Sequence, residues 1–108
     1  MPKFVTIGYG DQAFYDLTDV AVRYAAHAYD VQLLEDGAQT GRAGSPIQVR
    51  NHDGSGVITM DRPFMSSALP VAGFAIIEAA TLAEAIDIVS KAPSAVAQGV
   101  VEVWPLHE

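Results

Sequence analysis

The run from Val71 to Glu78 restricts the fold more than any other segment, because it is almost wholly apolar. A run of this length and hydrophobicity is typical of a central strand that is covered on at least one face. It is far shorter than the ~20 apolar residues that a membrane-spanning helix needs. We therefore expect a sheet that contains this strand, and no association with a membrane.

Both terminal segments and one internal hairpin complete the predicted strands. Residues Lys3–Tyr9 and Gly99–Trp104 are rich in β-branched and aromatic types, and their residues alternate between two faces. Residues Ile47–Arg50 and Val57–Met60 flank a turn-rich run over 51–56, which predicts a β-hairpin.

A helix is predicted from Thr18 to Asp36, with Asp16 or Thr18 as its N-cap and Gly37 as its stop. At 100° per residue its apolar side chains form two stripes. They are Val20, Tyr24, His27, Val31 and Leu34 on one stripe, and Val22, Ala26, Tyr29 and Leu33 on the other. The wedge between the stripes holds Arg23 and Asp30, which we expect on a solvated face.

A second helix is predicted to begin at Thr81, where Thr81 and Glu84 form a capping-box pattern, and to end by Pro93. One apolar face is expected, formed by Leu82, Ala85, Ile86 and Val89. The order of elements predicts a single α+β domain over residues 1–108, a ferredoxin-like sandwich that carries an extra hairpin. Its helices would cover one face of the sheet. The bare face would suit a second copy, so we expect a homodimer or a higher oligomer.

Composition excludes several classes of function. The chain has no cysteine, so disulfides, thiol catalysis and cysteine-ligated metals are excluded. A net charge of −7 leaves no basic stripe for nucleic acid. The N-terminus lacks the pattern of a signal peptide, and we expect a cytoplasmic protein. The basic residues Arg42, Arg50 and Arg62 gather around the hairpin, where an anion would be recognised if one is bound.

Three histidines raise the question of a metal site. His27, His52 and His107 show no ligand spacing, and the chain has no Gly-rich phosphate loop, so we expect neither a metal nor a nucleotide cofactor. His27 differs from the others because it lies within an apolar stripe. It is either a histidine at the edge of the core, satisfied by one hydrogen bond, or a general acid–base group in a partly dry pocket.

The other unusual segment is Asp61-Arg62-Pro63-Phe64, which follows the hairpin. Asp61 is either a turn former, whose side chain binds the following N–H groups, or a carboxylate that faces a pocket. In the second case Arg62 would bind an anionic group of a substrate.

The order of these motifs resembles that of the YCII-related family, in the branch named for its Asp-Gly-Pro-Phe (DGPF) motif. The resemblance covers nearly the whole chain. It rests on residues 3–10, Ala26-His27-Ala28-Tyr29 ahead of Glu35-Asp36-Gly37, residues 59–64, 71–78, 82–86 and Val101-Glu102-Val103-Trp104-Pro105. It implies a ferredoxin-like fold assembled as a dimeric α+β barrel, with His27 and Asp61 facing a cleft. Two positions depart from the family, because Arg62 replaces the motif glycine and Ala92-Pro93 replaces an Asp-Pro dipeptide.

The residues and the resemblance leave two functions open. The first is an enzyme without a metal or nucleotide cofactor, which isomerises, cyclises or oxidises a small, aromatic or polyketide-like metabolite. His27 would be the acid–base group and Asp61 its orienting or second carboxylate. The substrate would contact Arg62, and Tyr9, Tyr24 and Phe64 would form apolar walls. The second is a non-enzymatic dimeric module that binds a small ligand or a protein, with a regulatory role as one form of it.

Overall fold

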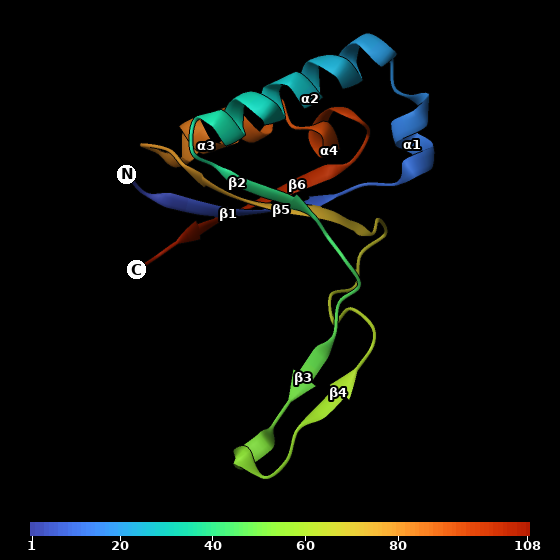
Figure 1. Cartoon of the computed structure of the whole chain (residues 1–108), viewed down its shortest axis with the longest axis vertical. Coiled ribbons are helices and arrows are strands. Elements are labelled where there is room, and N and C mark those ends of the chain that lie inside the picture. Colours follow the sequence, from blue (N-terminus) through green and yellow to red (C-terminus); the bar gives the residue numbers. More distant parts are fainter.

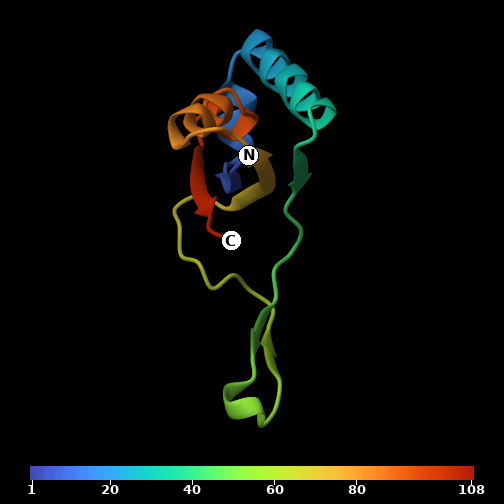
Figure 2. The same ribbon diagram turned by 90° about the vertical axis from the view of Figure 1, so that its left-hand side faces the viewer.

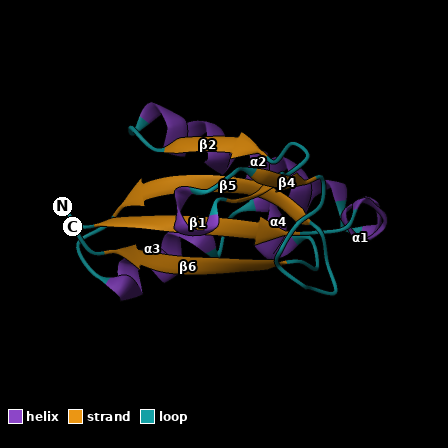
Figure 3. Cartoon of the chain, turned by 90° about the horizontal axis from the view of Figure 1, so that it is seen from below, coloured by secondary structure: helices purple, strands orange, loops and turns teal.

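Four strands form one antiparallel sheet in the computed structural model, which describes all 108 residues (Figure 1). They are β1 (Lys3–Tyr9), β2 (Gln39–Arg42), β5 (Val71–Glu78) and β6 (Val100–Leu106). Their order across the sheet is β2-β5-β1-β6, which Figure 3 shows from below. The apolar strand β5 therefore lies between two neighbours, as its sequence predicts. The sheet does not close into a barrel, because β2 and β6 are free edges.

All the helices lie on one side of this sheet, with α1 beyond the ends of the strands (Figures 1 and 3). They are α1 (Gln12–Leu17), α2 (Val20–Glu35), α3 (Leu82–Val89) and α4 (Pro93–Val96). Asp19 is the N-cap of α2, and its side chain accepts a hydrogen bond from the N–H of Ala21. Thr81 caps α3 by accepting from the N–H of Glu84, so the predicted start of this helix is confirmed. No helix is both long and apolar enough to cross a membrane.

The core between the helices and the sheet is small. Only 8 of the 108 residues are buried. Phe4 of β1 and Ile77 of β5 face each other across paired strands and pack against Ala79 and Ala85. The radius of gyration is 15.7 Å, against ~13 Å for a compact chain of this length.

The opposite face of the sheet is open, as the sequence predicts. Phe74 and Trp104 are large apolar residues on strands β5 and β6, and they are 51% and 56% exposed. Ile76 is also exposed there, next to Val5 of β1. We refer to this surface as the open face.

The predicted hairpin is confirmed and forms a separate two-stranded sheet. Strand β3 (Gln48–Arg50) pairs with β4 (Ile58–Met60), and the 3-10 turn η1 (His52–Gly54) lies near the tip. Figures 1 and 2 show that the hairpin extends away from the sheet on the side opposite the helices. We call residues 44–69, which connect β2 to β5, the arm.

Several sequence predictions about the elements are wrong. Helix α1 and strand β2 are not expected from the sequence, and the N-cap of α2 is Asp19 rather than Asp16 or Thr18. Pro93 does not only end the second helix, because it is also the first residue of the short helix α4. Strand β6 continues through Pro105, where the sequence predicts its end. Proline lacks a backbone N–H, and an edge strand tolerates it because only one side of the strand is paired with a neighbour.

The predicted apolar face of α3 is correct only in part. Ala85 is fully buried and Val89 packs against the core, whereas Leu82 and Ile86 are about half exposed. Ile88 takes a place on the buried side instead.

Candidate functional site

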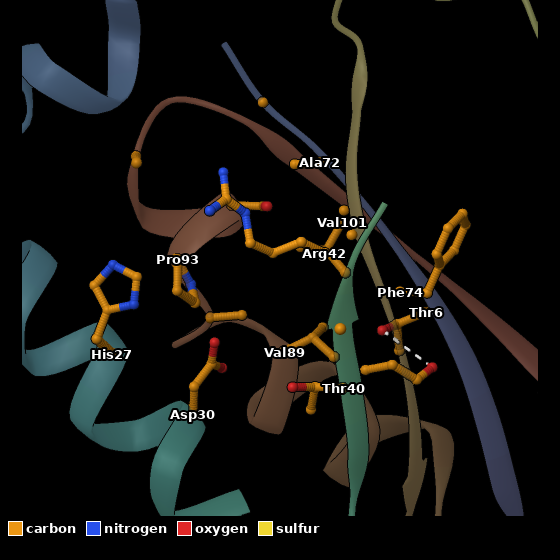
Figure 4. Close-up of a pocket in the computed structure, with 18 of the residues that line it drawn as sticks. Thr6, His27, Asp30, Thr40, Arg42, Ala72, Phe74, Val89, Pro93 and Val101 are labelled. Carbon is orange, nitrogen blue, oxygen red and sulfur yellow. Dashed lines mark hydrogen bonds between the residues drawn. The ribbon is translucent and has the colours of Figure 1, made fainter. Parts of the chain in front are cut away.

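A cavity of about 460 Å³ lies between α2, the sheet and α4. Its size is within the range of small-molecule sites. Apolar residues such as Leu33, Val89 and Val101 form much of its wall. The polar and charged side chains that line it come from several elements; they are Thr6, Asp11, Gln12, Tyr15, His27, Asp30, Thr40, Arg42 and Ser94. Figure 4 shows His27 and Asp30 on α2, with Thr40 and Arg42 on β2 across the cavity.

The inner face of α2 brings His27 and Asp30 to this cavity. Ala26 is the only buried residue of the helix, and Arg23 and Asp30 are half-buried beside it. The expectation that Arg23 and Asp30 lie on a solvated face is therefore wrong. On the sheet side, α2 packs mainly against α4 and the edge strand β2. The predicted apolar stripe that includes Val31 is largely exposed instead.

His27 forms a hydrogen bond with Tyr15 of α1. The Tyr15 hydroxyl oxygen lies 2.6 Å from Nε2 of His27, and the two rings meet edge to face with centroids 5.8 Å apart. The guanidinium of Arg23 lies over the Tyr15 ring, 5.0 Å from its centroid. Nε of Arg23 is buried and has no hydrogen-bond partner. Tyr15 is thus held by a cation on its face and by an imidazole at its hydroxyl.

Helix α1 positions Tyr15, and a side-chain cap positions α1. Asp11 accepts a hydrogen bond from the N–H of Ala13 at 2.8 Å, which starts the helix directly after β1. Tyr15 is not evident as a site residue from the sequence, because residues 10–17 have the pattern of a connection. One signal for a helix here is Asp11, a residue type that commonly caps helices, which is followed by the apolar pair Ala13-Phe14.

The carboxyl group of Asp30 is electrostatically unusual. Partial burial raises the pKa of Asp30 above its ordinary value, and the positive charge of protonated His27 counteracts part of this rise. Because the pKa is raised in the fold, Asp30 stabilises the protein below its ordinary pKa of 3.8, and this contribution is lost as the pH rises through the folded value. The ionised carboxylate is thus a local cost at neutral pH.

Replacing Asp30 tests whether its ionised carboxylate destabilises the protein at neutral pH. Asp30→Asn removes the charge and is expected to raise the free energy of unfolding at neutral pH, by no more than about 1 kcal/mol because solvent screens the half-buried site. The gain should vanish below pH 3.8, where Asp30 itself becomes neutral. Urea unfolding at several pH values measures it. Asp53→Asn, at an exposed left-handed position that both residues tolerate, is the matched control. A larger gain at acid pH than at neutral pH would contradict the prediction.

Of the site residues proposed from the sequence, only His27 lines this cavity. Asp61, Arg62 and Phe64 follow β4 in the arm, which extends away from the helix layer. Arg62 and Phe64 line a separate groove of the arm. The Phe64 ring there lies 5.8 Å from the guanidinium carbon of Arg50. A single chain therefore does not bring Asp61 to His27, because the hairpin that Asp61 follows extends away from the helices (Figure 1).

Tyr9 and Tyr24 also lie elsewhere. Tyr24 points outward from α2 and is 73% exposed. Tyr9 is buried and donates a hydrogen bond to Oε1 of Glu102 at 2.6 Å, with Met65 Sδ 3.8 Å from the same hydroxyl. The hydrogen bond to Glu102, burial, and the carboxylate charge together raise the pKa of Tyr9. These tyrosines do not form walls of the His27 cavity.

The cationic residues around the hairpin separate in the structure. Arg42 lines the cavity from β2, whereas Arg50 and Arg62 belong to the arm. The sequence places these three arginines near one another, but it does not show that the chain turns away from the sheet after Arg42. No three His, Asp or Glu side chains come close enough together to hold a metal ion.

Comparisons with known proteins leave the resemblance to the YCII-related family as a prediction. The sequence matches no protein-family model. It also matches no curated protein.

Proposed function

We propose that the protein is an acid–base catalyst that acts on a small metabolite in the His27 cavity. The observation that carries this proposal is the 2.6 Å contact between the Tyr15 hydroxyl and Nε2 of His27 at a cavity of about 460 Å³. Two proton-transfer groups in contact at a pocket of this size are what an isomerase needs. The proposal includes no metal or nucleotide, because the sequence has neither ligand spacing nor a phosphate loop.

Proton transfer in this cavity balances without a co-reactant. The neutral imidazole of His27 takes a proton from a carbon next to a substrate carbonyl, while the Tyr15 hydroxyl donates a hydrogen bond to the carbonyl oxygen, where negative charge develops. The imidazolium then returns the proton to a different carbon. The substrate is isomerised and both side chains regain their starting states. Of the predicted reactions, isomerisation is therefore the one we favour.

The remaining groups of the cavity fit a substrate that has a polar and an apolar end. Arg42 and Thr40 face α2 across the cavity (Figure 4), where they can bind a carbonyl or carboxylate group. Asp30, three residues after His27 on the same helix, takes the place that the sequence predicts for Asp61. Leu33 and Val89 provide apolar wall in place of the predicted aromatic residues.

Solvent exchange tests the proposal and does not require that the substrate be identified first. The protein is incubated in D₂O with a library of small keto acids and aromatic carbonyl compounds, and mass spectrometry follows each compound. We expect at least one compound to gain deuterium at carbon, because the imidazole exchanges its proton with solvent between the two transfers. Binding without any exchange or conversion would contradict the enzymatic proposal.

A non-enzymatic binding module is the second candidate. The exposure of His27 and the exposed apolar side chains of the open face favour it, because a protein with these features can serve as a dimeric ligand carrier or regulator. Binding of a library compound in the cavity with no chemical change would support this alternative.

We further propose that the sheet is a ferredoxin-like sandwich whose open face stacks on that of a second copy, as the resemblance to the YCII-related family implies. Phe74, Ile76 and Trp104 supply the apolar contact area. Such a homodimer would form the two-sheet barrel expected from the resemblance. We propose the cytoplasm as its location.

A further inference from the structure

The arm exposes apolar side chains on both of its faces. Val49 of β3 is opposite Thr59, and Ile58 and Met60 of β4 point to the other face. Val49 and Ile58 are 65% and 59% exposed. Further exposed apolar residues of the arm are Ile47, Val57, Phe64 and Met65. A hairpin with one face in water carries mainly polar side chains on that face, whereas this one presents exposed apolar side chains among the polar ones on both faces.

The arm is an ordered element that contacts its own sheet at Met65, next to the Tyr9 hydroxyl, and is otherwise left largely exposed. Gln48 donates a hydrogen bond to the carbonyl of Arg62, and the Asn51 side chain accepts one from the N–H of Gly56. Among the helices and strands, β3 and β4 have extensive contacts only with each other. Isolated two-stranded hairpins are at best marginally stable in water. The arm therefore needs a surface outside its own chain.

The total surface shows how much of the chain is left uncovered. The accessible surface is 7478 Å². A compact monomer of this mass exposes about 5,800 Å², so the excess is about 1,700 Å² per chain. If two chains covered this excess on each other, about 3,400 Å² would be removed from water, which is within the range of obligate homodimers.

The charge distribution favours a second copy as the partner. The arm carries two arginines and two aspartates and has no formal charge, so the whole −7 of the chain belongs to residues 1–43 and 70–108, which we call the body. A neutral arm therefore adds no like-charge repulsion when it packs against the acidic body of a second copy. The arm also presents Arg50 and Arg62 around its groove, where carboxylates of a second body can bind.

We propose that the arm of each chain packs along the body of a second copy of the same chain and clasps the dimer together. The arm leaves the sheet on the side of the open face (Figures 1 and 2). A second sheet stacked at about 10 Å on the open face therefore lies beside the arm. This inference rests on the proposed face-to-face dimer and adds the reciprocal exchange of arms.

An arm-deleted variant tests the clasp. The N–H of Ala43 donates to the carbonyl of Ala72 on neighbouring strands, so a four-residue Gly/Asn turn can replace residues 44–69 and join β2 to β5 directly. Sedimentation equilibrium of the full chain is expected to show a dimer. The deletion is expected to raise the dimer dissociation constant at least about 100-fold, because it removes apolar contacts from the interface. Far-UV circular dichroism checks that the variant is folded.

If the arm-deleted variant does not fold, a double substitution within the arm tests the clasp instead. Val49→Lys combined with Ile58→Lys places a charge on each face of the arm and leaves the hydrogen bonds of the hairpin in place. It is expected to weaken the dimer about as much as the deletion does. Ser66→Lys, at an exposed position of the same arm, adds a charge without removing an apolar contact and is the matched control.

The outcomes separate the clasp from the dimer on which it rests. A full chain that dimerises as tightly as the deleted and double-lysine variants would overturn the clasp and leave the face-to-face dimer standing. A full chain that stays monomeric at all concentrations would overturn both. Weakening by the arm variants alone, with the Ser66→Lys control unchanged, supports the clasp.

Discussion

Gly99→Ala is expected to destabilise the protein by about 3 kcal/mol or more. Gly99 lies between α4 and β6, and a Cβ at this position would overlap the carbonyl oxygen of Tyr9 and lie 2.5 Å from that of Ser94. Both obstacles are backbone atoms, so neither can rotate away. The methyl group must push α4 from the sheet, which also distorts the part of the cavity wall formed by Ser94 and Ala97.

Thermal and urea unfolding measure this effect. Gly44→Ala is the matched control, because a Cβ on Gly44 would meet nothing within 4 Å, and we expect a change within about 0.5 kcal/mol. Equal stability of the two alanine variants would show that the close approach of α4 to β1 is not required by the fold.

His27→Gln is expected to reduce the rate of the proposed proton transfer about 10²–10⁴-fold. Glutamine can still accept or donate a hydrogen bond at this position, but it cannot hold and release a proton near neutral pH. The loss should therefore appear in kcat and only weakly in KM. Deuterium incorporation into a substrate identified by solvent exchange provides the assay.

Two companion variants define the role of His27. His52→Gln alters an exposed histidine near the tip of the arm and should leave the rate unchanged. Tyr15→Phe keeps the aromatic ring and removes the hydroxyl that contacts Nε2, so it should also lower kcat, with little change in thermal stability. Full turnover by His27→Gln would remove His27 from the mechanism.

Much of the fold could be predicted from the sequence, because its signals are local. Apolar β-branched runs identified β1, β5 and β6, and the Thr81 cap identified the start of α3. Strand β2 was missed because Gln39-Thr40-Gly41-Arg42 has no apolar pattern. It is a strand because its backbone pairs with β5, and only the folded chain brings these two segments together.

The candidate site was harder to predict, because local patterns do not show which surfaces meet in the folded chain. Periodicity shows that α2 has distinct faces, but it does not show which of them meets the sheet. Of the two predicted apolar stripes, the one that contains Ala26 and Leu33 turns inward together with Asp30, whereas the stripe that contains Tyr24 is exposed. His27 was correctly singled out as unusual. Its neighbour Tyr15 depends on a helix that follows β1 directly, and the position of Asp61 depends on the direction of the arm, which no local pattern in the sequence indicates.

The two free edges of the sheet have a consequence for how the protein resists fibril formation. Strand β2 is only four residues long and ends at Arg42, and β6 contains Pro105, which has no N–H to offer a new strand. Short, charged or proline-containing edges are poor templates for the growth of cross-β aggregates. A chain that exposes this much apolar surface can therefore remain available for a specific partner without adding copies strand by strand.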